Sequence, residues 1–254
     1  MAAGRIAETE TESECSMAKR AVIFGASGGI GAALADRLRD DADLEQLYLG
    51  SRNPADPSDP RLVPFAFDLT DEASIAAAAG MVAGPIDLVF VATGMLHRSG
   101  GPSPEKAYRA LDPAAMAELY AINTIGPALI AKHFLPLLPR DRRAVFAALS
   151  ARVGSIGDNR LGGWHSYRAS KAALDMLLVN FAIELRRTHP LAIVAGLHPG
   201  TVDSALSAPF QRGVAPEKLF TPERSAEYLL AVLNQLTPDD SGGIFAWDGA
   251  RIPY

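Results

Sequence analysis

The chain has 254 residues, of which 48% are hydrophobic, so it is long enough for one large domain with a substantial core. Its formal net charge of −5 gives no reason to expect nucleic acid or an anionic membrane surface as a partner. The single cysteine, Cys15, excludes an internal disulfide and suits a reducing compartment, so we expect a cytoplasmic protein. No apolar run reaches the length of about 18 residues that a membrane span requires.

The amino-terminal segment differs from the rest of the chain. Residues 1–18 are polar and acidic, and they lack the apolar core of a signal peptide. We expect them to form a flexible extension and residues 19–254 to form a single folded domain. The Pro-rich run over residues 53–61 joins two neighbouring predicted strands, so it indicates a surface loop rather than a domain linker.

Short apolar runs that predict buried strands alternate with helical patterns over the rest of the chain. The predicted strands cover residues 20–26, 44–51, 62–69, 86–94, 143–151, 191–200 and 242–248. Helices are predicted over 29–41, 71–83, 113–138, the segment that contains Tyr167, and 222–236. The Gly126-Pro127 step should bend or break the third helix. Strands that are apolar throughout are typical of parallel sheets, so the pattern predicts an α/β fold: a doubly wound, Rossmann-type parallel sheet with helices on both faces.

A glycine-rich turn, "FGASGGIG", lies where the first predicted strand meets the first helix. Gly25, Gly29 and Gly31 permit a tight turn and a close backbone approach to a pyrophosphate at a helix amino terminus. Glycines also end strands for structural reasons alone, but the strand–turn–helix context favours nucleotide binding. We therefore expect this turn, with Ser27 and Ile30, to contact a dinucleotide cofactor.

The end of the second predicted strand indicates which dinucleotide is bound. Many dinucleotide folds place an acid there to bind the adenosine ribose, whereas this chain has Ser51 and Arg52. A guanidinium suits a 2′-phosphate, so the sequence predicts NADP(H) as the preferred cofactor, with NAD(H) possible; the alternative is a solvated arginine. After the third strand, Asp68 is either a helix cap or a ligand to adenine, together with its neighbour Leu69.

Tyr167 and Lys171 lie four residues apart and so share one face of a predicted helix. An ammonium near a phenol favours the phenolate and lowers the phenol pKa, which suits acid–base catalysis. The alternative is that two common helix-surface residues share this spacing by chance. Asn123 is a poor mid-helix residue, because its amide competes for backbone groups, and such a local cost is typical of a functional site.

These motifs and Pro199-Gly200 occur in an order that resembles the short-chain dehydrogenase/reductase family, from about Lys19 to the end of the chain. The segment "LSARVGSIGDNRLGGWHSYRASKAALDM" resembles the C-factor-like and sniffer-type carbonyl reductase branch. The resemblance implies an NAD(P)H-dependent oxidoreductase that transfers a hydride between nicotinamide and a small carbonyl or alcohol substrate.

The resemblance also implies roles for single residues. Tyr167 would be the acid–base, Lys171 would tune it and hold the nicotinamide ribose, and Asn123 would extend a proton relay. Further cofactor contacts are implied at Ala92, Thr93, Gly94, Pro199, Gly200 and Val202. The segment from about 201 to 222 resembles a substrate loop, and His97, Trp164 and Phe210 are candidates for lining the pocket without a catalytic role.

Two segments depart from the family pattern. The family usually has Ser-Ser after the fifth strand, the second being the serine that orients the substrate, whereas here the pair is Ser150-Ala151. Ser150 or Ser155 is then the candidate for the missing hydroxyl. The Asn-Asn-Ala-Gly of the family is replaced by Val91-Ala92-Thr93-Gly94.

Two other functions remain open at this stage. One is an NADP(H)-binding regulatory or signalling protein with little catalysis, which the missing serine favours. The other is an epimerase or dehydratase, which the short carboxyl-terminal region disfavours. The histidines show no ligand spacing, so we predict no metal. Apolar helices over 125–138 and 172–183 predict a homodimer or homotetramer.

Overall fold

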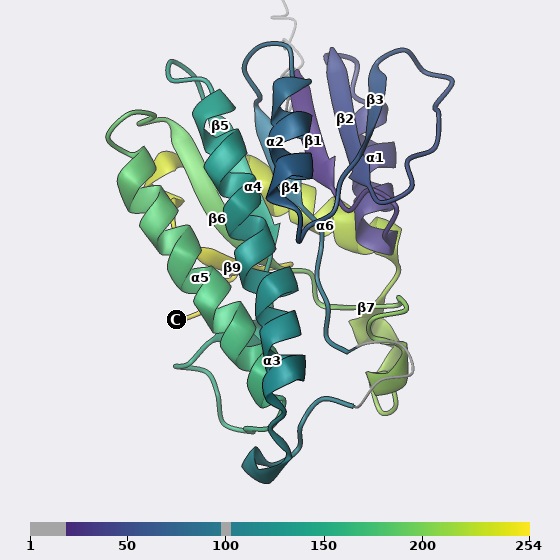
Figure 1. Cartoon of the computed structure of the whole chain (residues 1–254), viewed down its shortest axis with the longest axis vertical. Coiled ribbons are helices and arrows are strands. Elements are labelled where there is room, and N and C mark those ends of the chain that lie inside the picture. Colours follow the sequence, from purple (N-terminus) through teal and green to yellow (C-terminus); the bar gives the residue numbers. More distant parts are fainter. Residues whose placement is uncertain (1–18, 98–102) are drawn as a thin grey trace, which may run out of the picture.

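The computed structural model describes residues 19–97 and 103–254, so the expected extension over 1–18 lies outside the described residues. Its strands are β1 (Arg20–Phe24), β2 (Gln46–Ser51), β3 (Leu62–Ala66), β4 (Leu88–Val91), β5 (Ala144–Leu149), β6 (Ala192–His198), β7 (Thr201–Val202), β8 (Leu219–Phe220) and β9 (Ile244–Ala246). Seven of them form one parallel sheet in the order β3-β2-β1-β4-β5-β6-β9, and β7 pairs with β8 (Figure 1). The predicted doubly wound parallel sheet is confirmed.

Helices cover both faces of this sheet. They are α1 (Gly29–Arg39), α2 (Glu72–Gly80), α3 (Pro113–Tyr120), α4 (Gly126–Phe134), α5 (His165–Leu185) and α6 (Pro222–Gln235). Buried side chains of α1 and α6 pack on one face, and those of α2, α4 and α5 pack on the other. The two-sided cover explains why the strands are apolar throughout rather than alternating.

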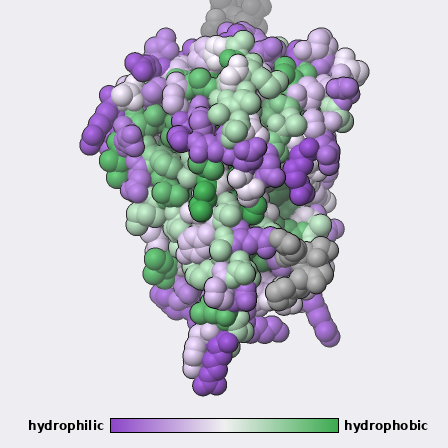
Figure 2. Space-filling view, viewed as in Figure 1, coloured by the Kyte–Doolittle hydropathy of each residue, from purple (hydrophilic) through white to green (hydrophobic). Residues whose placement is uncertain are grey.

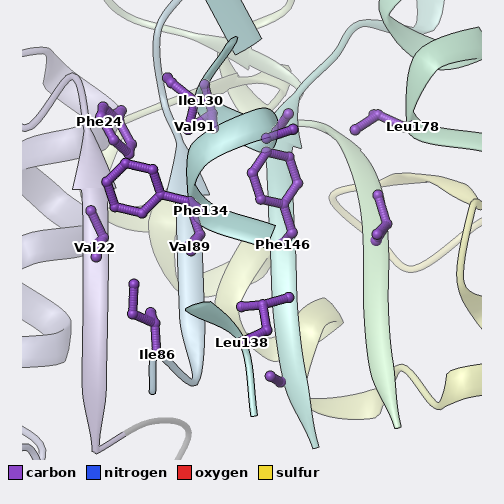
Figure 3. Close-up of a cluster of buried hydrophobic side chains, with 14 of the residues drawn as sticks. Val22, Phe24, Ile86, Val89, Val91, Ile130, Phe134, Leu138, Phe146 and Leu178 are labelled. Carbon is purple, nitrogen blue, oxygen red and sulfur yellow. The ribbon is translucent and has the colours of Figure 1, made fainter. Parts of the chain in front are cut away.

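Strand β1 shows how one strand contributes to two cores. Successive side chains of a strand point to opposite faces, so Val22 and Phe24 join the core under α4 and α5. Ala21 and Ile23 join the core under α1 and α6. In the first core, shown in Figure 3, the ring of Phe24 meets that of Phe134 edge-on, with centroids 4.9 Å apart. Such edge-to-face packing fixes the position of α4 against the carboxyl end of β1.

The predicted break at Gly126-Pro127 takes another form. Helices α3 and α4 are joined by a π-helical turn, Ala121–Ile125, and the helical stretch continues through the proline. Pro127 has no N–H, so the carbonyl of Asn123 lacks the donor that an α-helix would supply four residues later. The distortion therefore lies one turn before the proline and includes Asn123.

The continuous stretch Pro113–Leu137 bears on the expectation that no apolar run has membrane-spanning length. An 18-residue window within it reaches a mean hydropathy of 1.3, so length and composition alone would allow this stretch to cross a membrane. The core helix of a soluble protein passes the same test. Here Ile130 and Phe134 from this stretch are fully buried against the sheet, so part of its apolar character belongs to the core.

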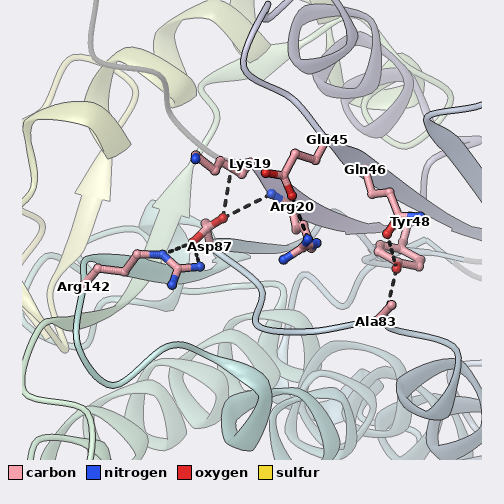
Figure 4. A network of polar contacts seen from close by, with 8 residues as sticks. All are labelled: Lys19, Arg20, Glu45, Gln46, Tyr48, Ala83, Asp87 and Arg142. Atoms are coloured by element: carbon pink, nitrogen blue, oxygen red, sulfur yellow. Dashed lines mark hydrogen bonds and ion pairs between the residues drawn. The ribbon is translucent and has the colours of Figure 1, made fainter.

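A buried carboxylate ties together the amino ends of three neighbouring strands (Figure 4). Asp87, just before β4, accepts hydrogen bonds from the backbone N–H groups of Lys19 and Arg20 at 3.2 and 3.1 Å. Arg142, just before β5, reaches the same carboxylate at 2.8 Å. These donors offset the cost of burying the charge. The network stabilises the amino edge of the sheet, opposite the edge where a ligand site would lie.

Candidate active site

A cleft of about 1030 Å³ lies at the carboxyl ends of the parallel strands. This is where open α/β sheets bind their ligands. Many of the predicted site residues line it: Gly29, Ile30, Arg52, Ala92, Thr93, Gly94, Ser150, Tyr167, Lys171, Pro199, Gly200 and Val202. Gly28, which the sequence analysis did not single out, lines it as well. The residues that the sequence separates by more than 170 positions therefore meet at one edge of the sheet.

The glycine turn shapes the floor of the cleft. Gly25 has a φ of +90°, which residues with a side chain rarely adopt. A Cβ on Gly31 would lie 2.1 Å from the Gly25 carbonyl oxygen. Gly28, Gly29 and Ile30 thus line the cleft, whereas Gly25, Ser27 and Gly31 belong to the same turn without lining it. No side chain caps the amino terminus of α1, so its first N–H groups remain for an anionic ligand.

Two predicted adenosine contacts have other partners in the structure. The carboxylate of Asp68 accepts hydrogen bonds from the backbone N–H and hydroxyl of Thr70 at 2.8 and 2.7 Å, and these bonds lower its pKa. Leu69 is buried against Gly126. Neither lines the cleft, whereas Arg52 does, and Ser51 is buried beside it at the end of β2. Asp68 is therefore not the cap of α2, which is Asp71, and its carboxylate instead holds the turn before that helix.

Tyr167 and Lys171 both lie in the first two turns of α5 and are both buried. The Nζ of Lys171 donates to the carbonyl of Leu149 at 2.7 Å and lies 6.0 Å from the Tyr167 ring centroid. Burial lowers the pKa of Lys171 to about 8 and raises the pKa of Tyr167 above its ordinary value. The sequence predicted a lowered pKa for Tyr167. This prediction was wrong, because burial raises the pKa and the Lys171 ammonium does not offset this effect.

Asn123 holds the elements of the site together. In the π-helical turn its amide accepts from the N–H of Met95 and donates to the carbonyl of Met95, both at 2.8 Å, and it also donates to the Ser170 hydroxyl at 3.0 Å. Asn123 therefore joins the segment after β4 to the residue next to Lys171. Gly94 lies close to both Lys171 and Asn123. A Cβ on Gly94 would be 3.6 Å from Lys171 Nζ and 3.7 Å from Asn123 Oδ1.

The two serine candidates for the missing hydroxyl both make hydrogen bonds within the protein. Ser150 lines the cleft, but its hydroxyl donates to Asp175 at 2.5 Å. Ser155 is buried, accepts from the N–H of Asp158 at 3.0 Å and does not line the cleft. Ala151 packs against Tyr167 where the family serine would lie. The side of the cleft next to Tyr167 thus has an apolar methyl group in place of a hydroxyl.

Asp175 is a site residue that the sequence analysis missed. It lies four residues after Lys171, hence on the same helix face, and it is buried. Burial raises its pKa to about 6, while the Ser150 hydrogen bond and the charge of Lys171 act in the opposite direction. The signal that would have found it is an acid continuing the Tyr167, Lys171 spacing on an otherwise apolar helix face.

The predicted substrate loop covers the open side of the cleft. Between β7 and β8 the chain forms short 3-10 turns, and Ser204, Leu206, Ser207, Phe210 and Val214 line the cleft. Of the three aromatic candidates, Trp164 and Phe210 line it, whereas His97 lines a separate pocket of about 80 Å³ and contacts the Phe210 ring.

Thr93 Oγ1 and His198 Nδ1, from two residues that line the cleft, are buried without a hydrogen-bond partner among the described residues. Buried polar atoms normally have a partner, so both atoms are exceptions to this rule. Within the described parts of the chain no group of three histidine, cysteine or acidic side chains could hold a metal ion.

A tyrosine and a lysine beside an uncapped helix amino terminus, at the carboxyl edge of a doubly wound sheet, define a nucleotide-dependent oxidoreductase site. The family model of the short chain dehydrogenases matches residues 19–214, and the chain belongs to this family.

Individual relatives agree with this assignment. The 1-hydroxy-2-glutathionyl-2-methyl-3-butene dehydrogenase of Rhodococcus sp. is 30% identical over 92% of this chain and 98% of its own length. The C-signal of Myxococcus xanthus is 30% identical over 70% of this chain and 98% of its own length. The NADPH-bound carbonyl reductase from chicken fatty liver superposes with a TM-score of 0.79 at 26% identity, covering 93% of this chain and 94% of that one. The protein is thus an oxidoreductase of the NAD(P)-dependent kind.

Proposed function

We propose that this protein is a reductase of small carbonyl compounds that prefers NADPH and works in the cytoplasm. The observation that carries the proposal is the convergence of Tyr167 and Lys171 with the open amino terminus of α1 in one cleft. Arg52, in the same cleft and next to the uncharged Ser51 at the end of β2, supports NADPH over NADH. The likeness to an NADPH-bound carbonyl reductase supports the same choice.

The residues present fit a dinucleotide. The N–H groups at the start of α1 suit a pyrophosphate, and the Arg52 guanidinium suits a 2′-phosphate. When bound, NADPH supplies the hydride for the reaction.

Two side chains of the protein carry out the proton transfer. Because burial raises the pKa of Tyr167, its hydroxyl is protonated at neutral pH and can donate to the carbonyl oxygen of a substrate. The Lys171 ammonium, held by the Leu149 carbonyl, then stabilises the phenolate left on Tyr167. Asn123 keeps α5 and the segment after β4 in register, so that both groups stay at the cleft. A protonated hydroxyl is the form that a proton donor in carbonyl reduction needs.

The test is NADPH oxidation by the purified protein with a panel of aldehydes, ketones and quinones, with Tyr167→Phe alongside. We expect turnover in the wild type and a loss of at least about 100-fold in the variant, with NADPH affinity retained. Turnover that survives in Tyr167→Phe would contradict the role of the tyrosine.

A second candidate function is a regulatory protein that binds NADP(H) with little catalysis. Ala151 in place of a hydroxyl and the 30% identity to the C-signal favour it. Tight NADPH binding without turnover on the whole panel would support this candidate and contradict the reductase.

We also propose that the protein is a homodimer or homotetramer. Ile125, Met176 and Ile183 expose 52%, 61% and 59% of their surfaces on the helical face that contains α3, α4 and α5. Apolar and polar side chains are interspersed on this face in Figure 2. Burying such side chains against a second copy would stabilise the assembly.

A further inference from the structure

We propose that Trp164 and Phe210 form an aromatic wall of the cleft that makes flat, aromatic carbonyl compounds the preferred substrates of this site. The inference rests on the proposed reductase function and names its substrate class. It starts from an unusual backbone conformation next to the catalytic helix.

Trp164, the residue that precedes α5, has φ 49° and ψ 44°, in the left-handed region. It is the only residue other than glycine with a positive φ within residues 19–97 and 103–254. Bulky side chains are disfavoured there, so such a conformation persists only where its surroundings hold it. The preceding Gly162 and Gly163, with φ of 62° and 67°, turn the chain in the same sense at little cost.

Glu105 provides the contacts that hold Trp164 in place. Its backbone carbonyl accepts from the N–H of Trp164, and its carboxylate accepts from both the hydroxyl and the N–H of Ser166. Ser166 is fully buried in the first turn of α5. The backbone of Trp164 is thereby fixed relative to the helix that carries Tyr167.

The result is a series of rings that starts at the proton donor. The Trp164 and Tyr167 ring centroids lie 6.3 Å apart at 72°, and those of Trp164 and Phe210 lie 5.1 Å apart at 62°. Both spacings are in the range of favourable aromatic pairs. Phe210 comes from the substrate loop between β7 and β8, so the pair joins that loop to the amino end of α5 across the cleft.

The hydrophobic neighbours of the aromatic wall come from other segments of the chain. Leu96, Ala151 and Val153 pack with Trp164 and Phe210 around Tyr167. At the rim, Arg152 and Asp158 pair with each other at 2.6 Å. A ligand beside Tyr167 therefore meets ring faces and edges, with no hydroxyl at position 151 to bind it. Ring contacts favour a planar aromatic group over a saturated ring of similar size.

Binding to protein saturated with NADP⁺, which cannot reduce a ketone, tests this without turnover. Calorimetry would compare acetophenone with cyclohexyl methyl ketone, which share the same carbon skeleton. We expect wild type to bind acetophenone about five- to tenfold more tightly. Trp164→Leu should remove this preference and Trp164→Phe should retain most of it. Phe210→Leu, on the outer loop, should also weaken it, whereas Tyr108→Leu, an exposed aromatic outside the cleft, should not.

Equal affinities in the wild type, or a preference that survives in both Trp164→Leu and Phe210→Leu, would overturn the inference. NADP⁺ affinity and the thermal melting temperature of each variant distinguish the loss of the aromatic wall from a loss of folding. A wild type that shows the preference but reduces no member of the aldehyde, ketone and quinone panel with NADPH would support the aromatic wall and contradict the reductase function.

Discussion

Arg52 is the side chain on which the choice of cofactor depends. It lines the cleft at the end of β2, and the neighbouring Ser51 carries no charge. We expect Arg52→Asp to reverse the preference, changing the ratio of kcat/KM for NADPH to that for NADH by about 10- to 100-fold, because a charge-assisted hydrogen bond is replaced by repulsion. Steady-state kinetics with both cofactors measures the ratio. Arg37→Asp, an exposed arginine of α1 paired with Glu227, is the matched control and should leave it unchanged.

The buried Asp175 sets the charge around Lys171. Because its carboxylate favours the protonated ammonium, Asp175→Asn should lower the pKa of Lys171 below its present value of about 8. The alkaline limb of the kcat/KM profile should then move to lower pH, as Lys171 loses its proton earlier. Ser150→Ala removes the hydrogen bond that lowers the pKa of Asp175 but keeps the carboxylate, so it should move the limb less than Asp175→Asn does. Coincident profiles for wild type and Asp175→Asn would contradict the role of this charge.

Ala151 offers a test by gain of function. A serine there would place a hydroxyl beside Tyr167, where the wild type has a buried methyl group. A positioned donor at a reacting oxygen contributes to the rate, so Ala151→Ser should raise kcat for a reducible carbonyl by about tenfold. An unchanged or lower kcat would show that the site polarises its substrate without need of that hydroxyl.

At the scale of elements, the π-helical turn and its packing on the segment after β3 position Asn123. A Cβ on Gly126 would lie 2.2 Å from Leu69 Cγ, in a buried place where nothing can give way cheaply. Gly126→Ala should therefore lower stability by about 1–3 kcal/mol, measured as a drop in the thermal melting temperature.

Gly80 provides the control for this substitution. It is the last residue of α2, and a Cβ there meets nothing within 4 Å. Gly80→Ala should be neutral or stabilising by up to about 1 kcal/mol, since alanine is the better helix former. Equal melting temperatures for Gly126→Ala and wild type would show that the contact between Leu69 and this turn relaxes.

At the scale of the whole molecule, the apolar side chains on α5 are the basis for the expected assembly. Met176 and Ile183 lie seven residues apart, hence on one helix face, and both are exposed. The double change Met176→Glu and Ile183→Glu should reduce the molecular mass in solution to that of a monomer, as measured by light scattering. Met81→Glu, at a half-exposed methionine just after α2, should leave the mass unchanged. A wild type that is already monomeric would contradict the proposal.

Local patterns in the sequence were enough to predict much of this molecule. Apolar strands and the glycine turn predicted the sheet and the cofactor edge, because these features depend on backbone geometry and on periodicity. Contacts through space were not predictable in the same way. The pairing of Ser150 with Asp175, the left-handed Trp164 and the effect of burial on Tyr167 all depend on which segments meet once the sheet has formed.

The Asp87 network at the amino edge of the sheet has a consequence for how this protein can evolve. It fastens β1, β4 and β5 at the edge remote from the cleft, so the fold does not depend on the loops that surround the substrate. Changes in loops such as the connection between Ala151 and Tyr167 can then alter which molecules are recognised without loosening the scaffold. New specificities can arise by loop exchange at one edge while inherited stability is kept at the other.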